Sequence, residues 1–127
     1  AADGVTSLSA LPPQSADGVP AIDAFHADMD RYAPDSERSA ISLNAWAGVQ
    51  MLAHVLRGLD AIDRASVLEA MNQLDDYDSR GLTPTLDFTG KPAVAGLPRL
   101  FNTSATVTRV SDGTQHWDGE FLKAAGN

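Results

Sequence analysis

The sequence predicts a mixed α/β fold with three helices, a few short strands and a C-terminal hairpin. Apolar residues recur at helical spacing in three separate stretches, within residues 20–34, 39–60 and 63–74. Alternating β-branched residues between Phe101 and Val110 run into the turn sequence Ser111-Asp112-Gly113, which is typical of a hairpin. The 127 residues are enough for one domain with a real apolar core.

The first part of the chain predicts a short strand followed by an amphipathic helix. Residues 5–10 alternate in character, and Pro12 and Pro13 end the strand because proline has no backbone N–H to donate. Pro20 suits the first helical position, where the missing N–H costs nothing, and Pro34 ends the helix. The apolar stripe of this helix consists of Ile22, Phe25, Met29 and Tyr32.

The stretch Ser39–Asp60 predicts one long, nearly all-apolar helix. Asp35, Ser36 and Ser39 offer side-chain oxygens that can cap its N-terminus, and Gly58 and Asp60 mark its end. Apolar residues cover most of its circumference, so we expect other elements to bury it on several sides. Asp63 can cap a third helix. The inner face of that helix consists of Val67, Ala70, Met71 and Leu74.

Short extended segments are predicted in the last third of the chain. Residues 86–88 form a candidate strand between Pro84 and the turn at Thr89-Gly90. Residues 115–117 are expected to be the return strand of the hairpin, and the tail from Phe121 onward is expected to fray.

Composition excludes several classes of partner and chemistry. The net charge of −8 and pI near 4.5 argue against nucleic acid and against an anionic membrane surface, since both attract basic patches. Without cysteine there is no disulfide and no thiolate metal site. Polar residues interrupt the longest apolar run, so no bilayer span is predicted. The N-terminus lacks a signal-peptide pattern, and a signal is expected upstream if the protein is exported.

No pattern in the chain predicts catalysis, a cofactor or a metal site. The histidines at 26, 54 and 116 fall on different predicted elements and lack metal-binding spacing. The acidic run Asp75, Asp76 and Asp78 lacks the ligand pattern of an EF-hand and is interpreted as a solvated loop. Nucleophile-elbow and phosphate-loop motifs are absent. Phe25 and Trp46 are more typical of core than of an aromatic pocket.

Four segments in order resemble the C-terminal portion of a periplasmic solute-binding protein of the branched-chain amino acid ABC transporter type. Residues 4–13 are similar to its crossover strand, and residues 20–34 to the helix that follows. Residues 45–56 (AWAGVQMLAHVL) resemble its aromatic-Ala helix. The segments GLTPTLDFTG and TVTRVSDGTQHW resemble its Phe-containing turn and closing hairpin.

The resemblance implies part of a three-layer lobe in a receptor that closes two lobes around its ligand. Residues 1–13 would be the crossover strand and hinge, residues 14–83 the helical part of one lobe, and residues 84–127 the strands and C-terminal hairpin. The implied hinge residues are Ser9, Ala10 and Leu11.

The resemblance also implies a ligand contact, a partner and a location. The residue at the start of the long helix would face the ligand's side chain, and here it is Ile41 or its neighbour Ser39. The family often has an aromatic residue there, and Ile41 departs from that pattern. The protein would bind an amino acid or related small molecule, without a cofactor, and deliver it to an ABC permease. It would be periplasmic or lipid-anchored outside the cytoplasmic membrane.

Two other functions stay open from the sequence. A ligand-binding sensory module of a receptor with the same fold would have similar segments. A small α/β enzyme would need a site built from scattered Asp, His and Ser residues, and no catalytic spacing favours it. In this chain the apolar helix at residues 39–60 would lack the sheet that such a receptor provides earlier in its sequence, so we also expect self-association by dimerisation or strand exchange.

Overall fold

Three helices and a three-stranded sheet form the part of the chain that the computed structural model describes, residues 3–90, 96–97 and 99–123. The α/β prediction is therefore confirmed. The elements follow the order β1 (Thr6–Ser9), α1 (Pro20–Tyr32), α2 (Ala40–Arg57), α3 (Arg64–Asn72), β2 (Ser104–Ser111) and β3 (Thr114–Lys123).

The sheet is antiparallel, with the strand order β1-β2-β3. Its edge strand β1 comes from the start of the chain and pairs Thr6 with Arg109 of the hairpin. The hairpin turn uses Asp112 and Gly113, both with positive φ (52° and 74°), as tight two-residue turns require. The return strand is longer than predicted, because it continues through Lys123 in register with Ser104. The expected fraying is wrong for Phe121, and residues 124–127 lie outside the described residues.

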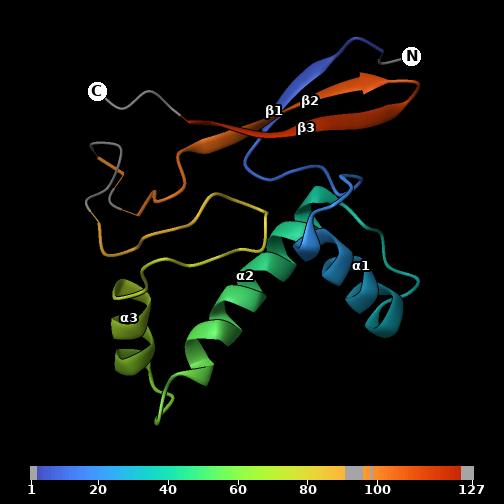
Figure 1. Cartoon of the computed structure of the whole chain (residues 1–127). Coiled ribbons are helices and arrows are strands. Elements are labelled where there is room, and N and C mark those ends of the chain that lie inside the picture. The colour runs from blue at the N-terminus through green and yellow to red at the C-terminus, as the bar shows by residue number, and fades with distance from the viewer. Residues whose placement is uncertain (1–2, 91–95, 98, 124–127) are drawn as a thin grey trace.

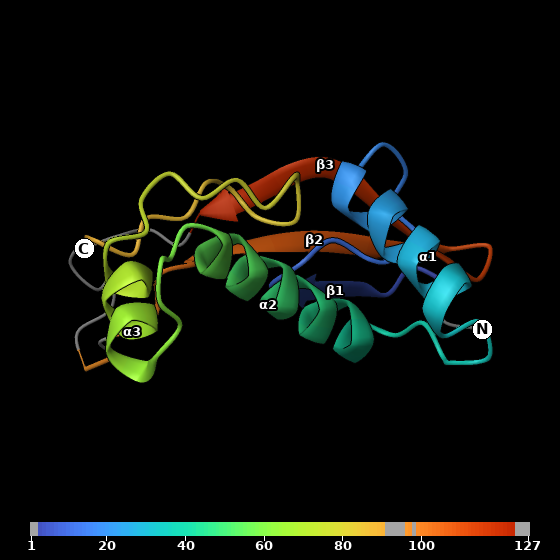
Figure 2. The same ribbon diagram turned by 90° about the horizontal axis from the view of Figure 1, so that it is seen from below.

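All three helices lie on one side of the sheet. Figure 1 shows them below the strands, with α1 and α3 to either side of α2. Seen from below, α2 crosses in front of the sheet along its length (Figure 2). The described part of the chain is thus a two-layer arrangement of helices on one face of a sheet.

The core lies where α1, the first turns of α2 and the flanking loops meet. Phe25 is fully buried and packs edge-on against Trp46, with ring centroids 5.9 Å apart. Tyr32 is 72% exposed, so the predicted apolar stripe of α1 stops at Met29. The tyrosine lies in the last turn, where the Arg31 guanidinium stacks on its ring. The buried core consists of Leu11, Val19, Ala21, Ile22, Phe25, Leu43 and Leu82.

Helix α2 begins as predicted and is buried less than predicted. Ser39 is its N-cap, and its hydroxyl accepts a hydrogen bond from the Ser42 backbone N–H. The prediction that other elements bury α2 on several sides is wrong for this chain. Within α2 only Leu43 and Val55 are buried. The reason is that neighbouring elements approach α2 from the side of the sheet, α1 and α3, and the described residues leave the opposite side uncovered.

After α2 the elements follow the predicted order, but the strand predicted at residues 86–88 is shorter than expected. Asp63 caps α3 through the backbone N–H groups of Ala65 and Ser66, and the predicted inner face of α3 is half-buried. The strand predicted at residues 86–88 reduces to a single bridge between Tyr77 and Leu86. Beyond this bridge the Phe88 backbone N–H donates to the Leu74 carbonyl oxygen at 2.8 Å. The segment then turns instead of continuing as a strand, because Asp87 Oδ1 accepts from the Thr89 backbone N–H.

Candidate ligand-binding site

The chain crosses from β1 towards α1 beside the start of α2, and a small hollow of about 110 Å³ lies at this junction. A water molecule occupies about 30 Å³ in the liquid, so the hollow has room for a few waters or one polar group. It is lined by Ser7, Ser9, Leu11, Pro12, Pro13, Gln14, Ala40, Leu43, Asn44, Thr108 and Gln115. The structure therefore brings the predicted hinge next to the first turn of α2.

Buried threonines of β2 hold the crossover in place. Thr106 is fully buried, and its hydroxyl donates to the Leu11 carbonyl oxygen at 2.9 Å. The carbonyl oxygen of Ser9 lies 3.2 Å from the same hydroxyl. Thr108, 2% exposed, pairs its hydroxyl with that of Ser7 at 2.6 Å. Backbone atoms on both sides of Ala10 are thus attached to β2, and Ala10 itself is exposed.

Ser39 and Ile41 lie at the start of α2 and line neither this hollow nor the larger cavity described below. Ser39 exchanges hydrogen bonds with Ser42, since the Ser42 hydroxyl also accepts from the Ser39 backbone N–H at 2.8 Å. The hydroxyl of Ser39 is therefore already used for capping. Ile41 is 82% exposed, which leaves its side chain free for a further contact.

A larger cavity of about 390 Å³ separates the side of α2 from the loop at residues 77–86. This size falls in the range of small-molecule sites, roughly 300–1,000 Å³. Its lining includes Trp46, Gln50, Met51, His54, Tyr77 and Arg80.

Aromatic and polar groups shape the wall of this cavity. Trp46 lines it and donates from its indole N–H to Asp28 Oδ2 at 2.9 Å, so it belongs to both core and cavity wall. His54 lies edge-on to Tyr77, with ring centroids 5.4 Å apart. Burial, with a smaller contribution from the Asp78 charge, raises the pKa of the Tyr77 phenol. The sequence did not identify His54 and Tyr77 as cavity-lining residues. The one signal was that His54 is a polar residue within the apolar run of α2.

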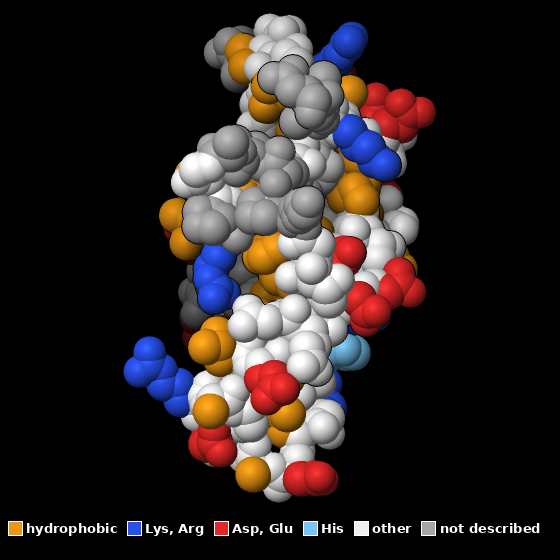
Figure 3. All heavy atoms as spheres, turned by 90° about the vertical axis from the view of Figure 1, so that its left-hand side faces the viewer, with side chains coloured by type: hydrophobic (Ala, Val, Ile, Leu, Met, Phe, Trp, Pro, Cys, Tyr) orange, Lys and Arg blue, Asp and Glu red, His pale blue; other side chains and the backbone are white. Residues whose placement is uncertain are grey.

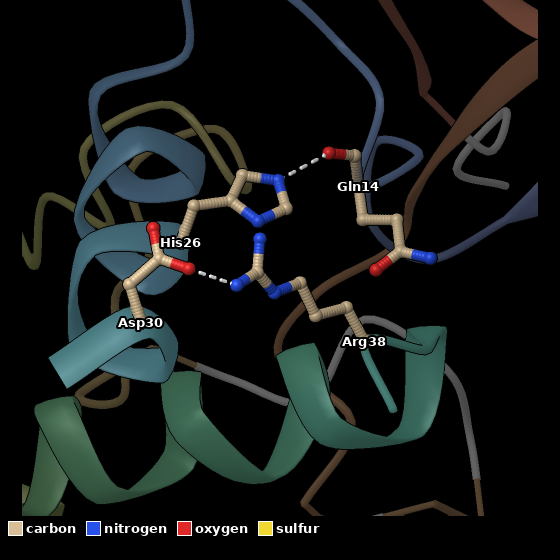
Figure 4. A network of polar contacts seen from close by, with 4 residues as sticks. All are labelled: Gln14, His26, Asp30 and Arg38. Carbon is tan, nitrogen blue, oxygen red and sulfur yellow. Dashed lines mark hydrogen bonds and ion pairs between the residues drawn. The ribbon is translucent and has the colours of Figure 1, made fainter. Parts of the chain in front are cut away.

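Polar contacts attach α1 to the crossover and to the start of α2 (Figure 4). His26 Nε2 lies 2.8 Å from the Gln14 carbonyl oxygen. Because a carbonyl only accepts, Nε2 carries the proton, and Nδ1 is left buried without a hydrogen-bond partner among the described residues. Arg38 pairs with Asp30 one turn further along α1. His26 therefore attaches α1 to the loop at Gln14.

The acidic loop at residues 75–78 is solvent-exposed at its three carboxylates, as predicted. Asp78 Oδ1 accepts from the Arg80 backbone N–H at 2.7 Å and so stabilises the turn. Within residues 3–90, 96–97 and 99–123 no group of three His, Cys, Asp or Glu side chains is placed to hold a metal ion. The described helices are each too short or too polar to cross a membrane.

This geometry defines an α/β lobe fragment whose crossover strand adjoins the start of a long helix, and comparison with known proteins agrees with it. A family model described as periplasmic binding protein matches residues 1–114. The chain belongs to the periplasmic binding protein family, whose members are solute-binding proteins and not enzymes. Membership implies an extracytoplasmic location. The family resemblance seen in the sequence is thereby confirmed.

A solved structure has the same fold. The crystal structure of a branched-chain amino acid ABC transporter from Thermus thermophilus with bound valine superposes with a TM-score of 0.62 at 13% sequence identity. The match covers 98% of this chain and 34% of that chain, so the present sequence spans about a third of its length. No curated protein sequence matches this chain.

Proposed function

We propose that this chain is part of the extracytoplasmic solute-binding component of an ABC importer for amino acids or related small molecules. The family match over residues 1–114 carries the proposal. The valine bound in the Thermus thermophilus structure supports an amino acid as the ligand class. Cleft binding needs shape, a few hydrogen bonds and a hinge, and the chain's motifs offer no activated nucleophile.

We assign the hinge to Ser9, Ala10 and Leu11. The support is that β1 ends at Ser9 and that Ala10 is exposed, so the backbone of Ala10 can rotate once the Thr106 hydroxyl releases the Leu11 carbonyl oxygen. Hinge residues need only absorb such rotations. β1 would stay paired with β2 while the segment after Leu11 turns.

We assign the ligand's side-chain contact to Ile41, with Ser39 as a weaker candidate. Ile41 is exposed in the first turn of α2 and has no competing role in this chain. Ser39 would have to share its hydroxyl between the ligand and the cap of α2. An aliphatic residue at this position favours a ligand with an apolar side chain over one that needs an aromatic partner.

The remaining roles belong to the same proposal. The receptor has no catalytic activity, works in the periplasm or from a lipid anchor, and passes its solute to an ABC permease. It needs no cofactor. The segments 1–13, 14–83 and 84–127 act as hinge, helical part and closing strands of one lobe.

Isothermal titration calorimetry of the receptor that carries this sequence, against a panel of amino acids and aromatic acids, tests the proposal. We expect saturable binding of at least one amino acid with an apolar side chain. Ile41→Ala should raise its Kd about 10-fold, since lost methylenes in an apolar pocket are worth 10–200-fold. Ile62→Ala is the matched control, because Ile62 is 68% exposed and lies beyond the far end of α2, and it should leave Kd unchanged. No binding across the panel would refute the function; equal effects of the two variants would refute only the role of Ile41.

A further inference from the structure

The cavity of about 390 Å³ beside α2, called the α2 cavity below, reaches the buried core. Three of its lining residues, Leu11, Ala21 and Leu82, are core residues, and none of them is more than 9% exposed. Trp46 and Met51 also line it and are half-buried. An apolar group that enters the α2 cavity exchanges water for apolar side chains, which is favourable. The volume lies near the lower end of the range for small-molecule sites, so the ligand has to be small.

Polar groups line the α2 cavity along one side of the helix. Gln50, His54 and Arg57 follow Trp46 at intervals of four, four and three residues, so successive members are neighbours on the helix surface. His54 and Arg57 are exposed, whereas Gln50 is half-buried. Tyr77 lines the cavity from the loop after α3, with its ring 5.4 Å from that of His54. The α2 cavity thus combines an apolar interior with polar groups near solvent.

Cations outnumber carboxylates around the α2 cavity, although the whole chain has a net charge of −8. The lining includes Arg57 and Arg80 and a single acidic residue, Asp78. The Arg80 guanidinium donates to the Pro20 carbonyl oxygen at 3.2 Å, and Asp78 accepts from the Arg80 backbone N–H at 2.7 Å. Arg57 forms no ion pair among the described residues. Its guanidinium is therefore the cation that is available to a ligand.

We propose that the α2 cavity binds a small carboxylate with an apolar body. The carboxylate pairs with the Arg57 guanidinium and accepts a hydrogen bond from the Tyr77 phenol, while the apolar body lies against Trp46 and Leu82. Burial, more than the Asp78 charge, raises the pKa of the Tyr77 phenol, so the phenol keeps the proton that it donates. Charge-assisted hydrogen bonds of this kind are about twice as strong as neutral ones.

The position of Arg57 in the last turn of α2 is compatible with an anionic ligand. The terminal carbonyl groups of a helix carry partial negative charge, which disfavours an anion close to them. A helical side chain points back toward the N-terminus, so the guanidinium is expected over the turn that contains His54. The carboxylate then lies away from the terminal carbonyl groups.

The α2 cavity is separate from the ligand contact assigned above. Ile41 and Ser39 do not line it. The carboxylate site therefore does not depend on the proposed transport function, and each of the two can be refuted without the other.

The groove along α3 is a weaker candidate for such a ligand. It also includes two arginines, Arg64 and Arg99, but none of the described residues that line it is buried. Figure 3 shows this side of the molecule, where basic side chains stand among acidic, polar and hydrophobic ones. An apolar group bound in this groove would stay largely in water, which favours the α2 cavity.

NMR titration of the full 127-residue chain with 3-phenylpropionate tests the proposal. We expect the backbone amide shifts to saturate below about 5 mM, as for a weak small ligand. The largest shifts are expected within residues 46–57 and 77–83. The neutral 3-phenylpropanol and the cationic 3-phenylpropylamine have the same carbon skeleton. Both should bind about 10-fold more weakly or not at all, because they lack the carboxylate that pairs with Arg57.

Variants of the two polar contacts locate the probe. Arg57→Gln should raise the Kd of 3-phenylpropionate about 10-fold, because it removes the cation. Arg64→Gln is the matched control, since it removes the same charge at an exposed position outside the α2 cavity and should leave Kd unchanged. Tyr77→Phe keeps the ring against His54 and should raise Kd about 3-fold through the lost hydrogen bond. Ile41→Ala should leave Kd unchanged. Circular dichroism checks that each variant folds.

Several results would overturn the carboxylate site. They are absence of saturation, equal binding of the acid, alcohol and amine, and shifts confined to other segments. Equal effects of Arg57→Gln and Arg64→Gln would reduce the interaction to net charge and overturn it too. Weaker binding in Ile41→Ala alone would place the probe at the start of α2, outside the α2 cavity, with the same consequence. The transport proposal has its own test in the amino-acid titration of the receptor.

Discussion

At the residue scale, single hydroxyl groups hold in place the segment that crosses from β1 towards α1. Thr106 is a polar residue in a fully buried position, and buried polar groups are tolerated when hydrogen-bonded. Its hydroxyl connects β2 to the Leu11 carbonyl, 95 residues away in sequence. One side chain therefore sets where the chain leaves β1 and turns towards α1.

Thr106→Val tests this connection, because valine keeps the shape and removes the donor. We expect a loss of about 1–3 kcal/mol in the free energy of unfolding, the usual cost of leaving a buried acceptor unsatisfied. Urea denaturation followed by circular dichroism measures it. Thr85→Val, at an exposed position, is the control and should change stability little. Equal effects of the two variants would contradict a structural role for the Thr106 hydroxyl.

Asp63 gives a second residue-scale prediction, which concerns pH. Hydrogen bonds from the Ser66 and Ala65 backbone N–H groups lower the pKa of its carboxyl group. A lowered folded-state pKa means that the stabilisation is complete above the unfolded-state pKa and is lost as pH falls through the folded-state pKa. Asp63→Asn keeps a capping side chain without the titration. Thermal unfolding between pH 7 and pH 2 should show wild type losing its advantage over this variant in the acidic range. A constant difference at every pH would refute it.

Capping is the main determinant at the scale of the elements. α2 has no acidic residue in its first turn, so the reciprocal bonds of Ser39 and Ser42 are what satisfy its N-terminal backbone donors. The same device recurs at α3, with Asp63 and Ser66. The starts of α2 and α3 are thus specified by pairs of residues three positions apart, whereas α1 begins at Pro20 without a side-chain cap.

Ser39→Ala should lower the free energy of unfolding by about 1 kcal/mol, the typical value for a lost N-cap. Ser36→Ala is the control, because Ser36 is exposed and lies outside the cap. Chemical denaturation measures both variants. A loss no greater for Ser39→Ala than for Ser36→Ala would show that the cap does not stabilise α2.

The whole molecule has a small core relative to its length. Phe25 is the largest fully buried side chain and contacts both His26 and Trp46. The helices cover one face of the sheet, so the other face of the sheet and the exposed side of α2 contribute little burial. Stability of the isolated chain therefore depends on few residues.

Phe25→Ala should remove about 3–5 kcal/mol, the usual cost of such a core truncation. Small domains are stable by only about 5–15 kcal/mol, so the variant is expected to be largely destabilised and to lose its cooperative transition near room temperature. Tryptophan fluorescence measures the transition through Trp46 and Trp117, which both pack against the core. Phe101→Ala is the matched control, since Phe101 is only half-buried against Phe88 and should cost much less. A cooperative wild-type-like transition in Phe25→Ala would contradict this description of the core.

The sequence by itself determined the elements whose signals are local. Prolines at 20 and 34, the cap at Ser39 and the turn at Asp112-Gly113 act within a few residues, and each element begins or turns where they predict. The family was also recognisable, because four local segments occur in order. The sequence did not determine the extent of β3 or the reduction of the predicted strand at residues 86–88, since both depend on which partner strand is available.

The tertiary structure alone decided what lies next to what. β1 pairs with β2 about a hundred residues later, and this pairing brings the crossover beside the start of α2. The apolar residues around most of α2 predicted burial on several sides, yet burial depends on neighbouring elements that a helical pattern does not specify. The exposed side of α2, the cavity beside His54 and Tyr77, and the exposure of Ile41 all follow from that arrangement. Periodicity reports which side chains share a face, and only packing decides which faces are covered.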